Sequence, residues 1–414
     1  MAKKANNYCS FCGRPESETD MLISGMEAKI CNFCIDQAME IIKEETGSTK
    51  GKAHQPLHSK TMKPAEIKAF LDSYVIGQDD AKKVLAVAVY NHYKRIDQPF
   101  DENEVEIEKS NIILVGDTGT GKTLLAKTIA RMLHVPFAIA DATVLTEAGY
   151  VGEDVESILT RLLQAADYDV PSAERGIIFI DEIDKIARKS DNPSITRDVS
   201  GEGVQQALLK LLEGTVVNVP PQGGRKHPEQ KMIAVDTKNI LFVAGGAFQG
   251  IERIIAGRLR TNVVGYSVTG SNIESVDKEN LLQYISPRDL KSFGLIPEIV
   301  GRMPVLTYLD PLDKAALKRI LTEPKNALTK QFVKLFKMDD VELTFDDKAL
   351  DFIVDKSVEF KLGARGLRSI IEGVLIDAMF ELPGKKRVKK LNITFDYATE
   401  KFTSTKLSKL KTAI

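Results

Sequence analysis

Gly116-Asp117-Thr118-Gly119-Thr120-Gly121-Lys122-Thr123 fits the phosphate-loop pattern G-x-x-x-x-G-K-[ST]. A strand-like apolar run at residues 112–115 precedes this loop, and a helical pattern that begins at Leu124 follows it. In such a strand–loop–helix unit the glycines allow backbone N–H groups to face phosphate oxygens, and the helix N-terminus adds the positive end of its dipole. Lys122 would then reach the β- and γ-phosphates, and Thr123 would bind Mg²⁺.

A second apolar run, residues 177–180, ends in two carboxylates, Asp181 and Glu182. A buried parallel strand would deliver both at its C-terminal edge, beside the phosphate loop. Asp181 would help to hold Mg²⁺ there, and Glu182 would polarise the attacking water. Taken alone, an apolar run followed by Asp-Glu is as typical of an ordinary strand and turn as it is of a catalytic strand. The phosphate loop upstream is what favours the catalytic interpretation.

The composition is that of a globular protein with two or three domains. The chain has 414 residues, of which 43% are hydrophobic and 28% charged, and its formal net charge is −1. No global basic field would attract nucleic acid or membrane, so we expect neither as a partner. The first residues lack the apolar region of a secretory signal, and no apolar run approaches 18 residues. These features predict a cytoplasmic protein.

The cysteines form two Cys-x-x-Cys pairs near the N-terminus. Cys9 and Cys12 make the first pair, Cys31 and Cys34 make the second, and the chain has no other cysteine. This spacing is typical of a four-thiolate Zn²⁺ site, in which each pair supplies two ligands. Two disulfides or four free thiols are the alternatives, and a cytosolic setting disfavours the disulfides.

The order of segments along the chain predicts an α/β fold class with several parts. Strand candidates lie at 111–115, 137–141, 177–181 and 239–244, with helical stretches between them. Loops rich in proline, glycine and charge lie at 190–201 and 218–236. Further helices are expected at about 313–336, 346–358 and 365–380, with short strands at 341–345 and 391–395. We therefore expect a zinc-binding module at 1–42, a flexible polar linker at 43–63, a large α/β domain at 64–309, a small, mainly helical domain at 310–400 and a polar tail at 401–414.

Three further features indicate which kind of nucleotide-dependent protein this is. Gly149-Tyr150-Val151-Gly152 has glycines on both sides of an aromatic–aliphatic pair, which favours a mobile loop that exposes Tyr150; a turn whose tyrosine packs into the core is the alternative. Arg302 could act on the γ-phosphate of a neighbouring subunit, and Arg365 opens a helical pattern where it could sense phosphate. For either arginine alone, a surface salt bridge is the simpler interpretation.

In combination these motifs resemble the ClpX family of AAA+ unfoldases, which act in bacterial ATP-dependent proteolysis. The resemblance runs from the cysteines to about residue 396. The motifs that carry it are the two Cys-x-x-Cys pairs, Tyr74-Val75-Ile76-Gly77-Gln78, Gly-Tyr-Val-Gly, Ile-Asp-Glu-Ile-Asp-Lys, Arg225-Lys226-His227 and Gly-Ala-Arg-Gly-Leu-Arg.

The resemblance implies a role for each matching residue. Val75 and Ile76 would line the adenine pocket, residues 116–124 would bind the phosphates, Arg302 would be the arginine finger and Arg365 the second sensor. Tyr150 and Val151 would form the first pore loop, residues around 190–201 the second, and Arg225, Lys226 and His227 a ring at the pore entrance. The implied assembly is a homohexameric ring that uses ATP, Mg²⁺ and Zn²⁺. Its implied partners are a ClpP-type peptidase, adaptors, and unfolded or degron-tagged protein substrates.

The chain also departs from the family pattern in three places. Asp117 stands where the family usually has proline, and an acid so near phosphates should repel them unless it points outward. The segment 239–247 ends without the polar residue of many AAA+ motors, so we assign no first sensor. The peptidase-docking loop usually reads aliphatic-Gly-Phe or aliphatic-Gly-Leu, and the best match here is Val264, Gly265 and Tyr266.

Three rival interpretations fit less well. A DNA-handling AAA+ ATPase would need a basic zinc module, but residues 9–36 contain only Arg14 and Lys29 as cations. The related unfoldase HslU lacks the zinc module and carries a long insertion, for which the chain has no room between Gly152 and Ile177. A non-enzymatic zinc adaptor would not need the complete set of Lys122, Asp181 and Glu182.

Overall fold

The computed structural model describes residues 8–19, 21–24, 28–35, 37–38, 62–98, 105, 107–146, 153–187, 201–220, 232–261, 280–384 and 389–404. The chain divides into two compact units, Met1–Ser59 and Lys60–Ile414. Each unit is described by itself below.

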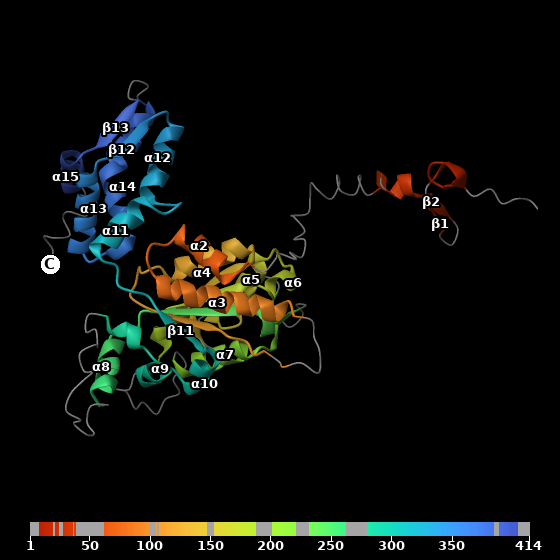
Figure 1. The fold of residues 1–414 in the computed structure, drawn as a ribbon, viewed down its shortest axis with the longest axis horizontal. Coiled ribbons are helices and arrows are strands. Elements are labelled where there is room, and N and C mark those ends of the chain that lie inside the picture. The colour runs from red at the N-terminus through yellow and green to blue at the C-terminus, as the bar shows by residue number, and fades with distance from the viewer. Residues whose placement is uncertain are drawn as a thin grey trace, which may run out of the picture. The chain divides into compact units, whose positions relative to one another are not determined.

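A five-stranded parallel sheet forms the centre of the larger unit (Figure 1). Its strands lie in the order β11 (Val305–Tyr308), β3 (Ile112–Val115), β10 (Leu241–Gly246), β7 (Ile177–Asp181) and β4 (Phe137–Asp141), and every neighbouring pair is parallel. Because all strands run the same way, β3, β7 and β10 end at the same edge of the sheet. The phosphate loop and the acidic pair therefore emerge side by side.

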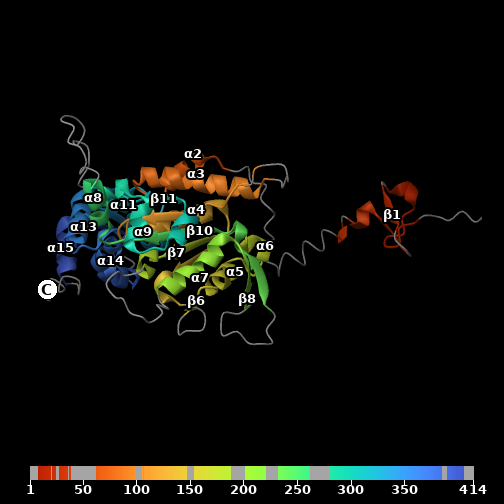
Figure 2. The ribbon, with the colours of Figure 1, turned by 90° about the horizontal axis from the view of Figure 1, so that it is seen from below.

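Successive side chains of each central strand enter different cores, as the two-residue period of a strand requires. Ile112 and Leu114 belong to the core under α2 (Pro64–Asp72), α3 (Asp79–Ile96) and α4 (Lys122–Leu133). Ile113 and Val115 belong to the core on the opposite face. The helices of that face are α5 (Ser157–Ala165), α7 (Glu202–Glu213), α8 (Ile251–Thr261), α9 (Pro287–Phe293) and α10 (Pro297–Arg302). Figures 1 and 2 show the sheet between these two layers.

Short elements surround the sheet. They are η2 (Ala142–Val144), β5 (Leu145–Thr146), β6 (Glu153–Asp154), α6 (Val170–Ala173), η3 (Ile183–Ile186), η4 (Thr237–Asn239) and η5 (Leu281–Tyr284). The strands β8 (Val216–Val219) and β9 (Ile233–Asp236) form an antiparallel pair. The range 218–236, expected to be a loop, therefore begins and ends in a strand.

The C-terminal part of the larger unit has its own apolar core, lined by side chains such as Phe336, Ile353, Leu367 and Ile371. Its elements are α11 (Lys314–Thr322), α12 (Leu328–Met338), β12 (Glu342–Phe345), α13 (Asp347–Glu359), α14 (Gly363–Glu381), η6 (Leu382–Gly384), β13 (Lys390–Ile393) and α15 (Phe395–Ser404). The strands β12 and β13 pair in parallel.

Most element predictions hold, but the helix α15 continues to Ser404, into the expected polar tail, and its Phe402 is buried in the core of the C-terminal part. Two further elements also differ. The single helix expected at 313–336 is two helices, because Pro324 lies between α11 and α12 and cannot continue a helix. The edge strand β11 was not predicted. None of the described helices is long and apolar enough to cross a membrane.

The N-terminal unit contains a short antiparallel pair, β1 (Leu22–Ser24) and β2 (Lys29–Cys31), and one 3-10 turn, η1 (Glu16–Glu18). In this pair Leu22 lies opposite Cys31. Among the described residues of this unit, the buried apolar ones are Cys9 and Cys31, so its small core consists of thiols.

Candidate functional site

The phosphate loop connects the end of β3 to the first residue of α4. Gly119 and Gly121 have φ values of +88° and +109°, a region in which a side chain is strained. A Cβ atom on Gly116 would lie 3.0 Å from the Cβ of Leu309 and 3.1 Å from its carbonyl oxygen. The pattern therefore needs glycine at these positions for conformation and for space.

Lys122 is 7% exposed, and its Nζ donates hydrogen bonds to the carbonyl oxygens of Gly116 (2.5 Å) and Asp117 (2.9 Å). Burial lowers the pKa of Lys122, and nearby carboxylates, that of Asp181 foremost, oppose the shift. The side chain of Asp117 is exposed, and its backbone carbonyl accepts from Thr120 Oγ1 at 2.7 Å. The Asp117 carboxylate is thus open to solvent.

Asp181 and Glu182 lie at the end of β7, as the sequence predicts. Thr123 Oγ1 donates to Asp181 Oδ2 at 3.2 Å, so a hydroxyl and a carboxylate oxygen lie next to each other. These are the hard oxygen ligands that Mg²⁺ prefers, and the pair fits its expected role. The metal would neutralise charge on the phosphates that Lys122 is expected to contact.

Glu182 has φ 57° and ψ 35°, a left-handed backbone that is unusual for glutamate. Its N–H donates to Asp181 Oδ1 at 3.0 Å, and its side chain is exposed. The sharp turn after β7 therefore separates the two carboxylates: that of Asp181 lies next to Thr123, and that of Glu182 is exposed. Backbone strain of this kind clusters at functional sites.

No side chain fits at the end of β10. A Cβ atom on Gly245 would lie 2.6 Å from the Phe179 ring, and one on Gly246 would lie 2.5 Å from the Phe248 ring and 2.8 Å from Asp184 Oδ1. Asp184, which the sequence analysis did not single out, is buried and accepts a hydrogen bond from the N–H of Ala247 at 3.1 Å. The strand β10 itself therefore offers only backbone groups at this edge, and the Asp184 carboxylate lies beside them.

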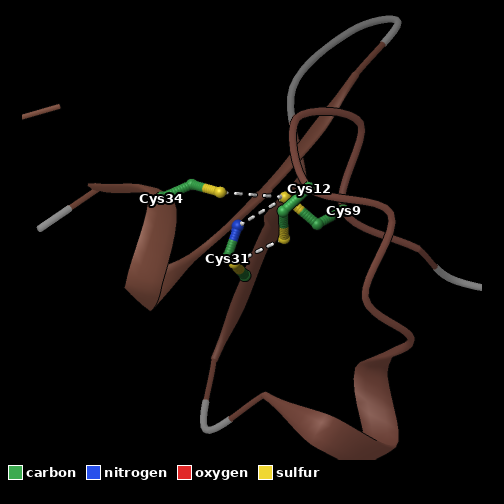
Figure 3. Close-up of side chains that lie close together, drawn as sticks. All are labelled: Cys9, Cys12, Cys31 and Cys34. Atoms are coloured by element: carbon green, nitrogen blue, oxygen red, sulfur yellow. Dashed lines mark hydrogen bonds between the residues drawn. The ribbon is translucent and has the colours of Figure 1, made fainter. Parts of the chain in front are cut away.

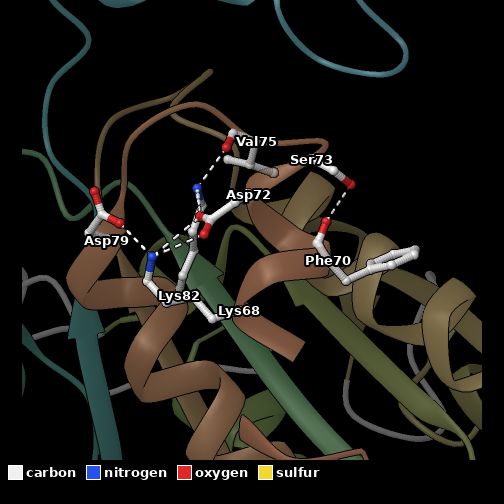
Figure 4. Close-up of polar contacts among 7 residues, drawn as sticks. All are labelled: Lys68, Phe70, Asp72, Ser73, Val75, Asp79 and Lys82. Carbon is white, nitrogen blue, oxygen red and sulfur yellow. Dashed lines mark hydrogen bonds and ion pairs between the residues drawn. The ribbon is translucent and has the colours of Figure 1, made fainter. Parts of the chain in front are cut away.

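Residues 73–78, here called the Val75 loop, connect α2 to α3 and contain Val75 and Ile76, which are both buried. A Cβ atom on Gly121 would lie 3.9 Å from Val75 Cγ1, so the loop reaches the phosphate loop. Lys82 Nζ donates to the Val75 carbonyl at 2.6 Å and pairs with Asp72 at 2.7 Å (Figure 4). A buried ammonium group thus holds the backbone of the expected adenine pocket.

The two candidate arginines lie in different surroundings. Arg365, in the first turn of α14, places its Cγ 3.9 Å from the position of a Cβ on Gly119. Arg302, at the end of α10, is half exposed and pairs with Glu213 at 3.3 Å. Arg365 therefore lies against the phosphate loop of its own chain, and Arg302 lies on the surface.

The four cysteine sulfur atoms converge in the N-terminal unit (Figure 3). All four lie within 4.8 Å of one another, with Sγ–Sγ distances of 3.8 Å for Cys9–Cys34 and 3.6 Å for Cys12–Cys31. Zn–S bonds of 2.3 Å in a tetrahedron put sulfur atoms about 3.8 Å apart, so these two distances match those of a zinc site.

The pKa values of two of the thiols, Cys9 and Cys34, are shifted in opposite directions. Burial raises the pKa of the Cys9 thiol, but backbone N–H groups that donate to its sulfur, first that of Cys12, bring it down to about 6. The hydrogen bond with the Cys12 side chain raises the pKa of Cys34 to about 12. A second thiolate beside the first is therefore unfavourable unless a cation lies between them, which is what a zinc ion supplies.

Three family descriptions match successive parts of the chain. Residues 7–44 match the ClpX C4-type zinc finger, residues 107–306 match the AAA domain (Cdc48 subfamily), and residues 312–395 match the C-terminal D2-small domain of ClpB protein. The ATP-dependent Clp protease ATP-binding subunit ClpX of Bacteroides fragilis is 65% identical over 417 residues, covering 100% of both chains. The protein of the same name from Porphyromonas gingivalis is 67% identical over 387 residues, covering 93% of this chain and 94% of the relative.

This chain belongs to the ClpX family.

The family assignment confirms the fold class and the enzyme class that the sequence predicts. The chain is an AAA+ ATPase with an α/β domain, a small C-terminal domain and a preceding zinc finger. Its cofactors are Zn²⁺ at the four cysteines, and ATP with Mg²⁺ in the AAA domain. The zinc-finger match favours the ClpX family over HslU and, with the AAA domain, excludes a non-enzymatic adaptor.

Several predicted ClpX-family positions lie outside the described residues. They are Tyr150 and Val151 of the first pore loop, residues 190–200 of the second, Arg225, Lys226 and His227, and Val264, Gly265 and Tyr266. Their roles stay predictions. The structure brings together Val75, Lys122, Thr123, Asp181 and Arg365. It adds Asp184, which lies in the Ile-Asp-Glu-Ile-Asp-Lys motif but has no role predicted from it, and Lys82, which lies in no motif.

Proposed function

We propose that this ClpX-family ATPase assembles as a homohexameric ring, unfolds protein substrates and threads them through its axis to a ClpP-type peptidase. The observation that carries the proposal is the close placement of Lys122, Thr123 and Asp181 at one edge of the sheet. The full-length relatives, which are named as ATP-binding subunits of the Clp protease, support it.

In this proposal each site residue has one task. Lys122 binds the β- and γ-phosphates, Thr123 and Asp181 hold Mg²⁺, and Glu182 orients the attacking water. Arg365 senses the phosphates from the small domain, and the exposed Arg302 acts on the ATP of the neighbouring subunit. The remaining assignments are Val75 and Ile76 to adenine, residues 116–124 to the phosphates, Tyr150 and Val151 to the first pore loop, and Arg225, Lys226 and His227 to the pore entrance.

The proposal also keeps the expected domain limits and surroundings. The limits are 1–42 for the zinc module, 43–63 for the linker, 64–309 and 310–400 for the two ATPase domains and 401–414 for the tail. We place the protein in the cytoplasm, where thiols stay reduced for zinc. Degron-tagged or unfolded proteins and their adaptors are the proposed partners, and nucleic acid is not.

A fluorescent reporter tests this function directly. A stably folded, degron-tagged fluorescent protein should lose fluorescence only when the chain and ATP are both present, and should be degraded when a ClpP-type peptidase is added. Persistent fluorescence while the chain hydrolyses ATP would reject the unfolding function.

Tyr150→Ala should separate ATP hydrolysis from unfolding. The nucleotide site stays intact, but the side chain proposed to contact the threaded polypeptide is lost. We expect the unfolding rate of stable substrates to fall at least about tenfold, equivalent to roughly 1.4 kcal/mol in the barrier. ATP turnover and reporter fluorescence are the two readouts. Tyr168→Ala, at an exposed tyrosine of the large domain, is the matched control, and unfolding at the wild-type rate by Tyr150→Ala would show that Tyr150 does not grip substrate.

Deletion of residues 263–267 should abolish peptide release by the peptidase complex while ATPase and unfolding activity persist. One aliphatic-Gly-aromatic contact is weak, but copies from several subunits raise the avidity through effective concentration. Tyr266 adds a hydroxyl group whose burial without a partner costs about 1–3 kcal/mol per site. Tyr266→Phe should therefore dock more tightly to a peptidase with a fully apolar pocket. Undiminished degradation by the deletion variant would place docking elsewhere on the ring.

A further inference from the structure

The segment that follows β11 contacts both nucleotide-binding loops. Leu309 packs against Gly116, and its N–H donates to the Val115 carbonyl at 2.8 Å. The next residue, Asp310, is the first of the segment 310–313 that leads to α11 of the small domain. This interdomain segment therefore begins directly beside the phosphate loop.

Asp310 is bound to Gln78, 232 positions away in the chain, through both of its backbone polar groups. Gln78 Nε2 donates to the Asp310 carbonyl at 2.9 Å, and the Asp310 N–H donates to Gln78 Oε1 at 2.8 Å. The carboxylate of Asp310 accepts a third bond from Asn280 Nδ2 at 2.7 Å. A primary amide can bond the N–H and the carbonyl of one residue in this way, because it presents a donor and an acceptor together.

Gln78 is 4% exposed and has φ 62° and ψ 38°. Such a left-handed backbone is uncommon for glutamine, and glycine would adopt it without strain. Glutamine therefore stands at a position whose backbone favours glycine. Its side chain supplies the two hydrogen bonds to Asp310, which glycine could not make.

The other end of the Val75 loop also contacts residues beyond β11. The N–H of Lys325 donates to the Ser73 carbonyl at 2.9 Å, and Lys325 Nζ lies 5.6 Å from the ring centre of Tyr74. Lys325 belongs to the turn between α11 and α12 of the small domain. The loop that carries the expected adenine pocket is thus bonded to the interdomain segment at Gln78 and to the small domain at Ser73.

We propose that Gln78 is a positioning residue that fixes the Val75 loop to the start of the interdomain segment at Asp310, so that nucleotide affinity and small-domain orientation depend on each other. The proposal rests on the proposed ATPase function. Gln78 touches no reacting group and acts through Val75 on one side and Asp310 on the other. The two Gln78–Asp310 hydrogen bonds are here called the clamp. Their loss would loosen the Val75 loop and the interdomain segment.

Hydrogen exchange of the peptide around residues 309–313 in full-length Gln78→Gly tests the clamp without nucleotide. Loss of two hydrogen bonds should speed exchange roughly tenfold there, although glycine relieves the backbone strain. The KM for ATP should rise severalfold with a smaller change in kcat. Asp340→Gly is the matched control, because Asp340 is an exposed residue with φ 58° in the turn after α12.

Gln78→Glu is a second variant that keeps the shape and the acceptor but places a carboxylate oxygen against the Asp310 carbonyl in a buried position, so it should speed exchange at least as much as Gln78→Gly. Exchange in Gln78→Gly and Gln78→Glu equal to that in Asp340→Gly would overturn the clamp. If the wild-type chain failed to hydrolyse ATP, the proposed function would be rejected, yet the nucleotide-free exchange comparison would still decide the role of Gln78.

Discussion

Glu182→Gln is expected to bind ATP with near wild-type affinity and to hydrolyse it about 10²–10⁴-fold more slowly. The amide keeps the shape of the carboxylate but cannot accept the proton of the attacking water, and positioned general bases contribute factors of that size. Thr123 and Asp181, which hold each other at 3.2 Å, are unchanged. Steady-state phosphate release together with equilibrium binding of labelled ATP measures the two effects separately.

Two further variants complete this test. Lys122→Ala should weaken nucleotide binding itself, because it removes the cation proposed to bind the phosphates. Glu342→Gln changes an exposed glutamate on β12, paired with Lys390, and should leave both quantities unaltered. Near-normal turnover in Glu182→Gln would show that another residue activates the water.

The parts of the site that lie within one motif were predictable from the sequence. The strand β7 has the limits 177–181 that its apolar run indicates, and the glycines of the phosphate loop have the positive φ values that their motif requires. In such segments the chemistry depends on residues that are close in the chain. A local pattern is then enough to place them.

The missed features depend on contacts between distant segments. The four residues of β11 form a strand by pairing with β3, and nothing within them marks an edge strand. Gln78 acquires its role from the backbone of a residue 232 positions away, and Lys82 from a carbonyl of the preceding loop. No periodicity reports such bonds. The helix break between α11 and α12, by contrast, has a local signal, because Pro324 cannot continue a helix.

The N-terminal unit shows why metal binding dominates the stability of a small module. Its described strands have three residues each, and its buried apolar residues are Cys9 and Cys31. So small a core buries too little apolar surface to fold by itself. Structural zinc contributes about 10–16 kcal/mol in zinc-finger peptides, and this binding energy can fold such a module.

Cys12→Ser should therefore lose its zinc and unfold the module, while ATP hydrolysis by the rest of the chain persists. Serine is a poor zinc ligand, and three remaining thiolates leave the tetrahedron open. We expect zinc content to fall from one per chain towards zero and proteolytic cleavage within residues 8–38 to increase about a hundredfold or more, because the lost metal-binding energy exceeds the stability of the module. Phe11→Ala is the matched control, since Phe11 is the exposed neighbour of Cys12 in the same turn. Zinc well below one per chain in intact wild-type protein would contradict the assignment of all four ligands, and an ATPase rate that fell together with the zinc content would show that the module acts on the ATPase domains.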